Sequence, residues 1–201
     1  MVTQLSTTGR NAMLDAFEPH VGTAPDLEIR SGPPPASCAS ADSGTLLALG
    51  TLPSDWLGSA ASGAKPQAGS WAYTGQSGAG AGTAPGHYRV KKSSVCHLQG
   101  TCGPAVALTT NGATAANGNV LAFANTTGVL VGHNVSGTGI PAGATVVAVT
   151  STTVTLSHTS TVGVSSSTAI TFAPDLVTNS PTISNGQAGT VTGYQVTVGG
   201  A

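Results

Sequence analysis

The residues able to do chemistry are few, and one short segment holds the densest group of them. Cys96, His97 and Cys102 lie close together, and His87 precedes them. Thiolates and imidazoles are the ligands that zinc prefers in proteins. Structural zinc sites, however, use paired cysteines two to four residues apart, and adjacent residues of a strand point to opposite faces. The pattern therefore predicts no metal site.

The cysteines leave their redox state open. The chain has three of them, Cys38, Cys96 and Cys102. An odd and small number does not define a disulfide framework. Cys96 and Cys102 can form a disulfide if they lie on adjacent strands, and otherwise all three are thiols.

Catalytic groups show no spacing typical of an active site. General acid–base catalysis needs two positioned carboxylates or a histidine with a partner. A serine on a strand–turn–helix elbow, or a glycine loop that binds phosphate, requires a motif followed by a helix. The sequence has neither motif, and its carboxylates are scattered: Asp15, Glu18, Asp26, Glu28, Asp42, Asp55 and Asp175. We expect no enzyme, no catalytic residues and no cofactor.

Charge is scarce and unevenly distributed. Only 6% of the residues are charged, and the net charge is −1. Every Lys and Arg lies at or before Lys92, and residues 93–201 carry a single charged side chain, Asp175. Nucleic-acid binding requires clustered cations. The nearest group, Arg89, Lys91 and Lys92, is more typical of a solvated strand face, so we expect no nucleic-acid partner.

The sequence also gives no sign of a membrane or secreted protein. It has no run of about 18 apolar residues, which a transmembrane helix requires. Its N-terminus lacks a basic start followed by an apolar stretch, so we expect no secretory signal. Asn125 and Asn134 begin two N-glycosylation patterns, which we attribute to the Thr- and Ser-rich composition.

The composition favours an assembled protein. The chain is 39% hydrophobic but only 4% aromatic. Small apolar side chains bury little area each, so stability requires extensive backbone pairing or subunit contacts. A soluble monomer usually carries more surface charge. We therefore expect a homo-oligomer.

Sequence periodicity predicts a short helix and many strands in the first half. Ser6 or Thr7 can cap a helix over residues 10–17, which Pro19 and Gly22 end. Alternating apolar residues predict strands at 26–30, 45–52, 69–74, 87–90 and 94–99. Turn residues predict loops at 31–35, 57–69 and 75–86. This spacing is typical of an antiparallel β-sandwich or jelly roll.

The amino-acid composition changes after residue 103. Residues 105–172 carry no charge and are rich in Thr, Val, Gly and Ala. Strands are predicted at 119–124, 135–137, 145–150, 153–156 and 169–172. In the tail, Asn185 and Gly186 form a turn signal before a final strand at 190–198.

Several runs resemble a family of tailed-bacteriophage and prophage virion proteins. They are STTGRNAMLDAF, PDLEIRSGPPP, SADSGTLLALGTLPSDW, GTAPGHYRV and CHLQGTCG. In that family the Q-G-T segment runs almost directly into a stretch similar to residues 175–201. Here residues 104–174 are extra, and 129–172 resemble a small all-β module that recurs in phage structural proteins. We therefore predict a β-sandwich-like domain, 1–103 plus 175–201, interrupted by a β-module, 104–174, at a tolerated insertion point.

The resemblance implies a non-enzymatic structural protein, located in the virion and assembled in the bacterial cytoplasm. The first interpretation is a capsid decoration or cement protein that binds the major capsid protein as a homo-oligomer, with a trimer favoured. The second is a tail, collar or fibre component. The third is a host-surface or glycan-binding module with aromatic contact residues, although core packing explains most of them: Trp56, Trp71, Tyr73 and Tyr194.

Overall fold

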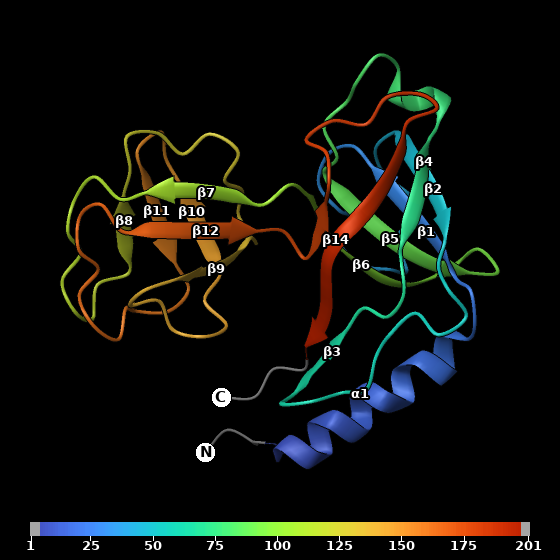
Figure 1. Cartoon of the computed structure of the whole chain (residues 1–201), viewed down its shortest axis with the longest axis horizontal. Coiled ribbons are helices and arrows are strands. Elements are labelled where there is room, and N and C mark those ends of the chain that lie inside the picture. Colours follow the sequence, from blue (N-terminus) through green and yellow to red (C-terminus); the bar gives the residue numbers. More distant parts are fainter. Residues whose placement is uncertain (1–4, 198–201) are drawn as a thin grey trace. The chain divides into compact units, whose positions relative to one another are not determined.

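The chain divides into two compact units in a computed structural model that describes residues 5–197 (Figure 1). The first unit comprises Met1–Gly103 and Leu176–Ala201, and the second is Pro104–Asp175. The sequence assigned Asp175 to the first domain, but this residue belongs to the second unit. Its carboxylate accepts a hydrogen bond from Asn134 Nδ2 at 3.3 Å.

The first unit begins with helix α1 (Thr7–Val21). Ser6 caps it, because its hydroxyl accepts a hydrogen bond from the Gly9 amide at 3.1 Å. The helix continues through Pro19 and ends at Gly22, whose φ of 94° favours glycine. Of the two residues predicted to end the helix, Gly22 is confirmed as its C-cap, whereas Pro19 lies inside the helix, because proline in the last turn removes only one hydrogen bond there.

The strands of the first unit close into a barrel. The hydrogen-bonded order is β13–β6–β5–β1–β2–β4–β14, and β13 also pairs with β14. The mainly β fold with a short N-terminal helix is confirmed, but the sandwich or jelly-roll arrangement is not. The barrel strands are β1 (Asp26–Arg30), β2 (Leu46–Thr51), β4 (Ala72–Gly75), β5 (His87–Lys92), β6 (Val95–Gly103), β13 (Leu176–Thr178) and β14 (Ala188–Thr197).

Two strands of this unit were missed in the sequence. Strand β3 (Ala64–Pro66), which pairs with the end of β14, lies in the expected loop 57–69. Strand β13 is three residues long and closes the barrel. Residue 198 of the predicted last strand lies outside the described residues. A short 3₁₀ helix, η1 (Ser77–Ala79), follows β4.

The barrel core is built around aromatic rings. Trp71 packs on Tyr194 and Trp56, with ring centroids 4.8 and 5.9 Å apart. Their polar atoms have partners, because the indole of Trp56 donates to Gly22 O and that of Trp71 donates to Trp56 O. Tyr88 donates to the Tyr194 hydroxyl at 3.0 Å. The few aromatic residues are thus concentrated where one core requires bulk.

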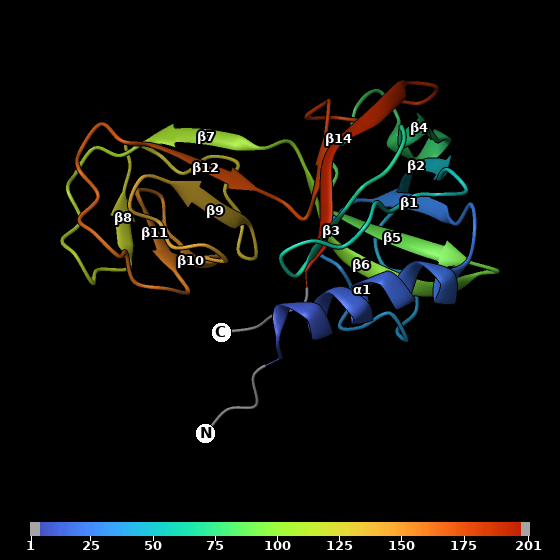
Figure 2. The ribbon, with the colours of Figure 1, turned by 60° about the horizontal axis from the view of Figure 1, so that its bottom comes forward.

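The second unit consists of two three-stranded sheets around a separate core (Figure 2). One sheet has the order β10–β11–β8 and the other β7–β12–β9. Inward residues of both sheets, including Val154 and Phe172, form that core. Only β7 was not predicted. The strands are β7 (Val106–Thr109), β8 (Val120–Ala122), β9 (Asn134–Gly137), β10 (Val146–Val149), β11 (Thr153–Leu156) and β12 (Ala169–Ala173).

The two ends of the inserted unit leave the barrel at neighbouring positions. Strands β6 and β13 are parallel, with Leu176 opposite Cys102 and Val177 opposite Gly103. Paired strands lie about 4.8 Å apart. The chain therefore leaves the barrel at the end of β6 and returns beside it at β13. The cost of joining these two positions by a longer inserted segment grows only slowly with its length.

Candidate functional site

Strands β1 and β5 carry a row of charged side chains on the outer face of the barrel. Leu27 and Ile29 point into the core, so Glu28 and Arg30 point outward. Arg89 on β5 lies directly opposite Glu28 on β1. The alternation of a strand with one face in the core therefore places these charges side by side.

Residues 31–45, which connect β1 to β2 and are called the strap below, cover this row. Every strap residue is at least partly exposed, so the strap has no apolar anchor in the core. Its beginning lies against the residue before β5, where a side chain on Gly86 would collide with the carbonyl oxygen of Gly32. Polar contacts and a covalent link hold the rest of the strap in place.

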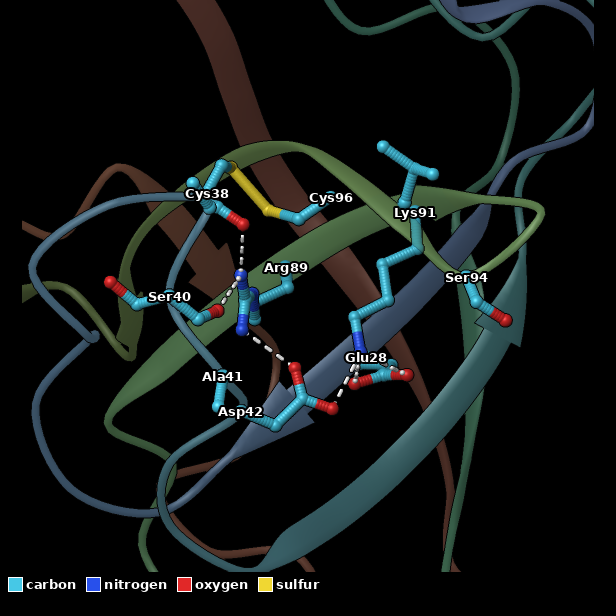
Figure 3. A pocket seen from close by; sticks show the side chains of 11 residues that line it. Glu28, Cys38, Ser40, Ala41, Asp42, Arg89, Lys91, Ser94 and Cys96 are labelled. Carbon is cyan, nitrogen blue, oxygen red and sulfur yellow. Dashed lines mark hydrogen bonds and ion pairs between the residues drawn. A yellow bond between two sulfur atoms is a disulfide. The ribbon is translucent and has the colours of Figure 1, made fainter.

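Asp42 of the strap is bound by three cations at once, and Figure 3 shows two of them, Arg89 and Lys91. Its Oδ1 accepts from Arg89 at 2.6 Å, and its Oδ2 accepts from Arg30 at 2.8 Å and from Lys91 at 2.7 Å. The hydrogen bond from Lys91 is the largest cause that lowers the pKa of Asp42, and the charges of Arg30, Lys91 and Arg89 add to it. The carboxylate is therefore ionised well below neutral pH.

Arg89 is the most deeply buried member of this cluster, with a side chain only 1% exposed. Its Nη2 donates to the carbonyl oxygens of Cys38 at 2.7 Å and Ser40 at 3.1 Å. Among the described residues no partner accepts from its Nε. Glu28 supplies the second carboxylate, 2.9 Å from Lys91 and 2.8 Å from Arg30. The cluster thus holds three cations against two carboxylates.

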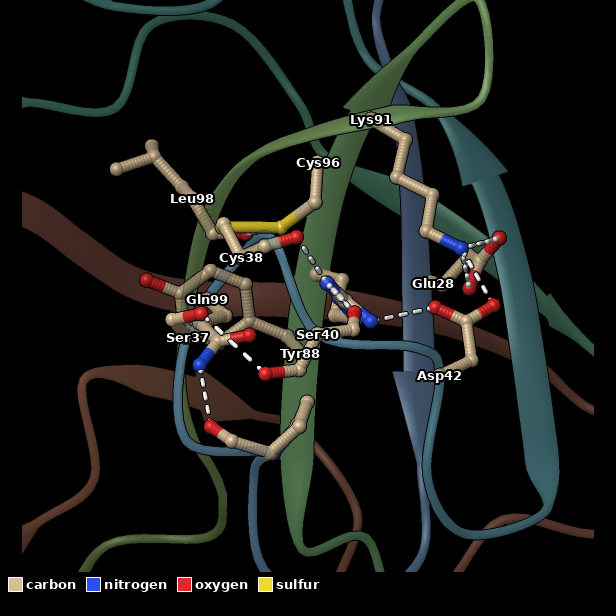
Figure 4. Close-up of a disulfide and its surroundings, with 12 residues drawn as sticks. Glu28, Ser37, Cys38, Ser40, Asp42, Tyr88, Lys91, Cys96, Leu98 and Gln99 are labelled. Carbon is tan, nitrogen blue, oxygen red and sulfur yellow. Dashed lines mark hydrogen bonds and ion pairs between the residues drawn. A yellow bond between two sulfur atoms is a disulfide. The ribbon is translucent and has the colours of Figure 1, made fainter.

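A disulfide between Cys38 and Cys96 ties the strap to β6 (Figure 4). Both alternatives from the sequence, a Cys96–Cys102 bond and three thiols, are wrong, because Cys96 pairs with Cys38 and only Cys102 is a free thiol, with a pKa that burial raises. Gln99 of the same strand donates to Pro35 O at 2.6 Å. The bond spans 58 residues of sequence. In the chain-entropy model a loop of that size is worth up to about 4 kcal/mol.

A pocket of about 780 Å³ opens between the strap and the β5–β6 turn. Its wall combines the disulfide with both signs of charge. The lining residues are Glu28, Cys38, Ala39, Ser40, Ala41, Asp42, Arg89, Lys91, Ser94, Val95 and Cys96. Such a wall can bind polar and ionic groups, but it contains no histidine or free thiol for catalysis.

The residues weighed for zinc are not brought together. Cys96 is in the disulfide, and His97 stacks edge-on against His20 with ring centroids 5.6 Å apart. His87 is buried, and its Nδ1 lies 2.9 Å from Gly32 O. Among residues 5–197 no group of three or more His, Cys, Asp and Glu is arranged to hold a metal ion.

The solvated cationic face expected at β5 does not exist. All six Lys and Arg side chains of the chain are buried or half-buried. Lys65, for example, pairs with Asp15 at 3.0 Å and Glu18 at 3.5 Å. The sequence did not predict the cluster, because Asp42 lies between the predicted loop 31–35 and the predicted strand 45–52, in a segment that received no assignment. The available signal was a long connection without large apolar residues that contains a cysteine.

The aromatic residues weighed for glycan binding are also placed elsewhere. Trp56, Trp71, Tyr73 and Tyr194 are all buried in the barrel core. Burial raises the pKa of Tyr73 to about 12. These rings stabilise the fold and present no exposed platform for a sugar.

Comparison with known protein families, curated proteins and solved structures gave no match. The site must therefore be interpreted from its own geometry. No helix among the described residues is both long and apolar enough to cross a membrane.

Proposed function

We propose that this chain is a non-enzymatic structural protein of a bacteriophage virion, and specifically a decoration protein that binds the major capsid shell as a homo-oligomer. The observation that carries this proposal is the outer face of sheet β10–β11–β8 in the inserted unit. That face is built for contact with a neutral protein surface.

The face is formed by one ladder of outward residues. Ala148, Thr155 and Val120 are consecutive partners across the three strands. Val147, at a bulge in β10, is 49% exposed beside them. The neighbours of Thr155 in the strand, Val154 and Leu156, point into the core, which confirms that this ladder faces outward.

The apolar surface continues along the edge of β10. The backbone of Gly132 donates to Val146 O, so the preceding residue lies beside Val147. That residue, Val131, and its neighbour Leu130 are 59% and 52% exposed. Isolated exposed apolar residues need no explanation, but a contiguous group of them is typical of an interaction site.

The absence of charge from residues 104–174 suits such a contact. Asp175 is the only charged side chain in the second unit. Burying an unpaired ion in an interface is costly, and interface cores are depleted of charged residues. In the barrel, ion pairs within the unit use most of the cations, which leaves little positive charge at the surface.

The experiment that tests the proposal is quantification of this chain in purified particles. We expect many copies on isolated heads and loss of bound protein when Val147→Asp is added back to undecorated heads. The matched control is Val95→Asp on the barrel, where Val95 is 58% exposed. Detection in a few copies, confined to tails or fibres, would favour the tail, collar or fibre alternative instead. Binding of neither variant nor wild type to heads contradicts the proposal.

A further inference from the structure

We propose that the strap covers a redox-controlled binding site for a carboxylate-bearing segment of another protein, and that Asp42 is the built-in occupant of that site. Reduction of the Cys38–Cys96 disulfide releases the strap and exposes the cations that Asp42 now binds. The inference concerns the barrel alone and stands independently of a role in virions.

The first support is the geometry around Asp42. Arg30, Arg89 and Lys91 approach its two oxygens from separate directions at 2.6–2.8 Å. Each contact is a single charge-assisted hydrogen bond, which is roughly twice as strong as a neutral one. The cations belong to the rigid strands β1 and β5, whereas the carboxylate belongs to the strap. The receptor is therefore preformed, and its occupant is the part that can move.

The second support is how the strap is attached. None of residues 31–45 is fully buried, and none belongs to the barrel core. Hydrophobic burial, the main force that holds loops down, is therefore weak here. The strap depends on the disulfide, on Asp42 and on hydrogen bonds such as that from Gln99 Nε2 to Pro35 O. Breaking the covalent tie lowers the effective concentration of Asp42 at the cations, because the strap is then held only by its two chain ends and its polar contacts.

The third support is the charge that the strap leaves behind. With Asp42 in place the cluster has three cations against two carboxylates. When Asp42 leaves, Glu28 is the one carboxylate still paired with Arg30 and Lys91, and Asp26 is opposite Lys91 in the strand register. The site then has a surplus of positive charge. Its adjoining pocket of about 780 Å³ has room for a peptide segment.

The chemical step is an ordinary thiol–disulfide exchange. A dithiol reductant supplies two electrons and two protons, the S–S bond breaks, and Cys38 and Cys96 become thiols while the reductant becomes a disulfide. The strap is then joined to the barrel only through its two chain ends. An acidic segment competes with Asp42 for the same three cations.

The probe is a blocked, fluorescent peptide Ala-Ser-Ala-Asp-Ser-Gly, which copies residues 39–44. Its binding is measured by polarisation to full-length oxidised protein, to Cys38→Ser/Cys96→Ser, and to that variant with Asp42→Asn added. We expect no saturable binding to oxidised protein. We expect the Cys38→Ser/Cys96→Ser variant, called the untied chain below, to bind the peptide at least tenfold more tightly when Asp42→Asn is added to it. A peptide with Asn in place of Asp should bind at least tenfold more weakly.

The matched control for Asp42→Asn is Asp55→Asn in the Cys38→Ser/Cys96→Ser chain. Asp55 is an exposed carboxylate in the segment after β2, and it does not line the pocket. This control should leave peptide binding unchanged. Equal binding to oxidised and untied protein, equal binding of the Asp and Asn peptides, or no binding by the folded Asp42→Asn variant would each overturn the proposal.

A second measurement tests the proposal even if the variant with all three substitutions (Cys38→Ser, Cys96→Ser and Asp42→Asn) does not fold. Amide hydrogen exchange of the wild type is compared before and after addition of dithiothreitol. We expect residues 31–45 to exchange at least tenfold faster after reduction, while the inserted unit is unchanged. Exchange of the strap that is the same in both states contradicts the release on which the site depends.

Discussion

The barrel and the inserted unit stabilise a mainly β fold with different side chains. The barrel contains both tryptophans, all three tyrosines, all six Lys and Arg residues and the disulfide. The inserted unit has two phenylalanines in its core and one carboxylate, Asp175. Bulky rings and ionic contacts fix the barrel, whereas the inserted unit depends on β-branched packing and backbone pairing. The difference shows that the same class of fold can be stabilised by two different sets of side chains.

The largest expected effect is loss of the barrel core. Trp71→Ala removes a fully buried ring that contacts Trp56 and Tyr194, and we expect it to lower the free energy of unfolding of the barrel by about 4 kcal/mol. The unfolding transition of the inserted unit, followed by hydrogen exchange of Pro104–Asp175, should not move. A matching loss in both units would show that they unfold together, and would contradict the view that each unit is stabilised by its own side chains.

The disulfide should have the next largest effect, again in the barrel. Cys38→Ser/Cys96→Ser removes a covalent link across 58 residues, and we expect a loss of about 3 kcal/mol in denaturant unfolding. Cys102→Ser, which alters a buried thiol outside the link, is the contrasting variant. Reductant should lower the free energy of unfolding of Cys102→Ser by the same amount as that of the wild type, because both keep the disulfide.

The charge cluster should contribute less than the disulfide. Asp42→Asn leaves Arg89 buried with one fewer counter-charge, and we expect a loss of about 2 kcal/mol because the carboxylate is 36% exposed and partly screened. The loss should shrink at high salt. An effect independent of salt would mean that packing, and not charge, holds the strap.

Acid should weaken both units through one buried histidine in each. Burial lowers the pKa of His87 in the barrel and of His133 in the inserted unit, below an ordinary value of 6.5. Because the folded state favours the neutral ring, this stability is fully present above pH 6.5 and is lost as the pH falls through the folded pKa. Arg30 and Arg89 add to the lowering at His87, whereas Asp175 opposes it at His133.

The measurement for the histidines is the melting temperature of each unit between pH 7 and pH 5. His133→Gln should flatten the profile of the inserted unit only. Substitution of the exposed His158 to Gln should leave it steep. An unchanged slope in His133→Gln would assign the acid sensitivity to another group.

The smallest expected effect is that of Val147→Asp on the stability of the isolated protein. Val147 is on the outer face of its sheet and 49% exposed, so we expect a change below about 0.5 kcal/mol. This variant therefore separates contact from folding. A large loss of stability would show that Val147 serves the core and would remove the main support for an interaction face.

Local patterns in the sequence were sufficient for the helix and for most strands. Alternation identified β1 and β11, and Ser6 marked the beginning of α1. Strands β3, β7 and β13 were missed, although each is paired in the structure: β3 with β14, β7 with β12, and β13 with β6 and β14. Strands β3 and β13 are only three residues long, which is too short for alternation to show.

By itself the sequence determined a mainly β chain with a change of character after residue 103 and a scarcity of charge. Only the tertiary structure decided that the first unit closes into a barrel, that Cys38 pairs with Cys96, and that Asp42 meets three cations. The physical reason is distance along the chain. Periodicity reports which face of a strand is buried, but pairing between remote segments depends on how the sheet closes.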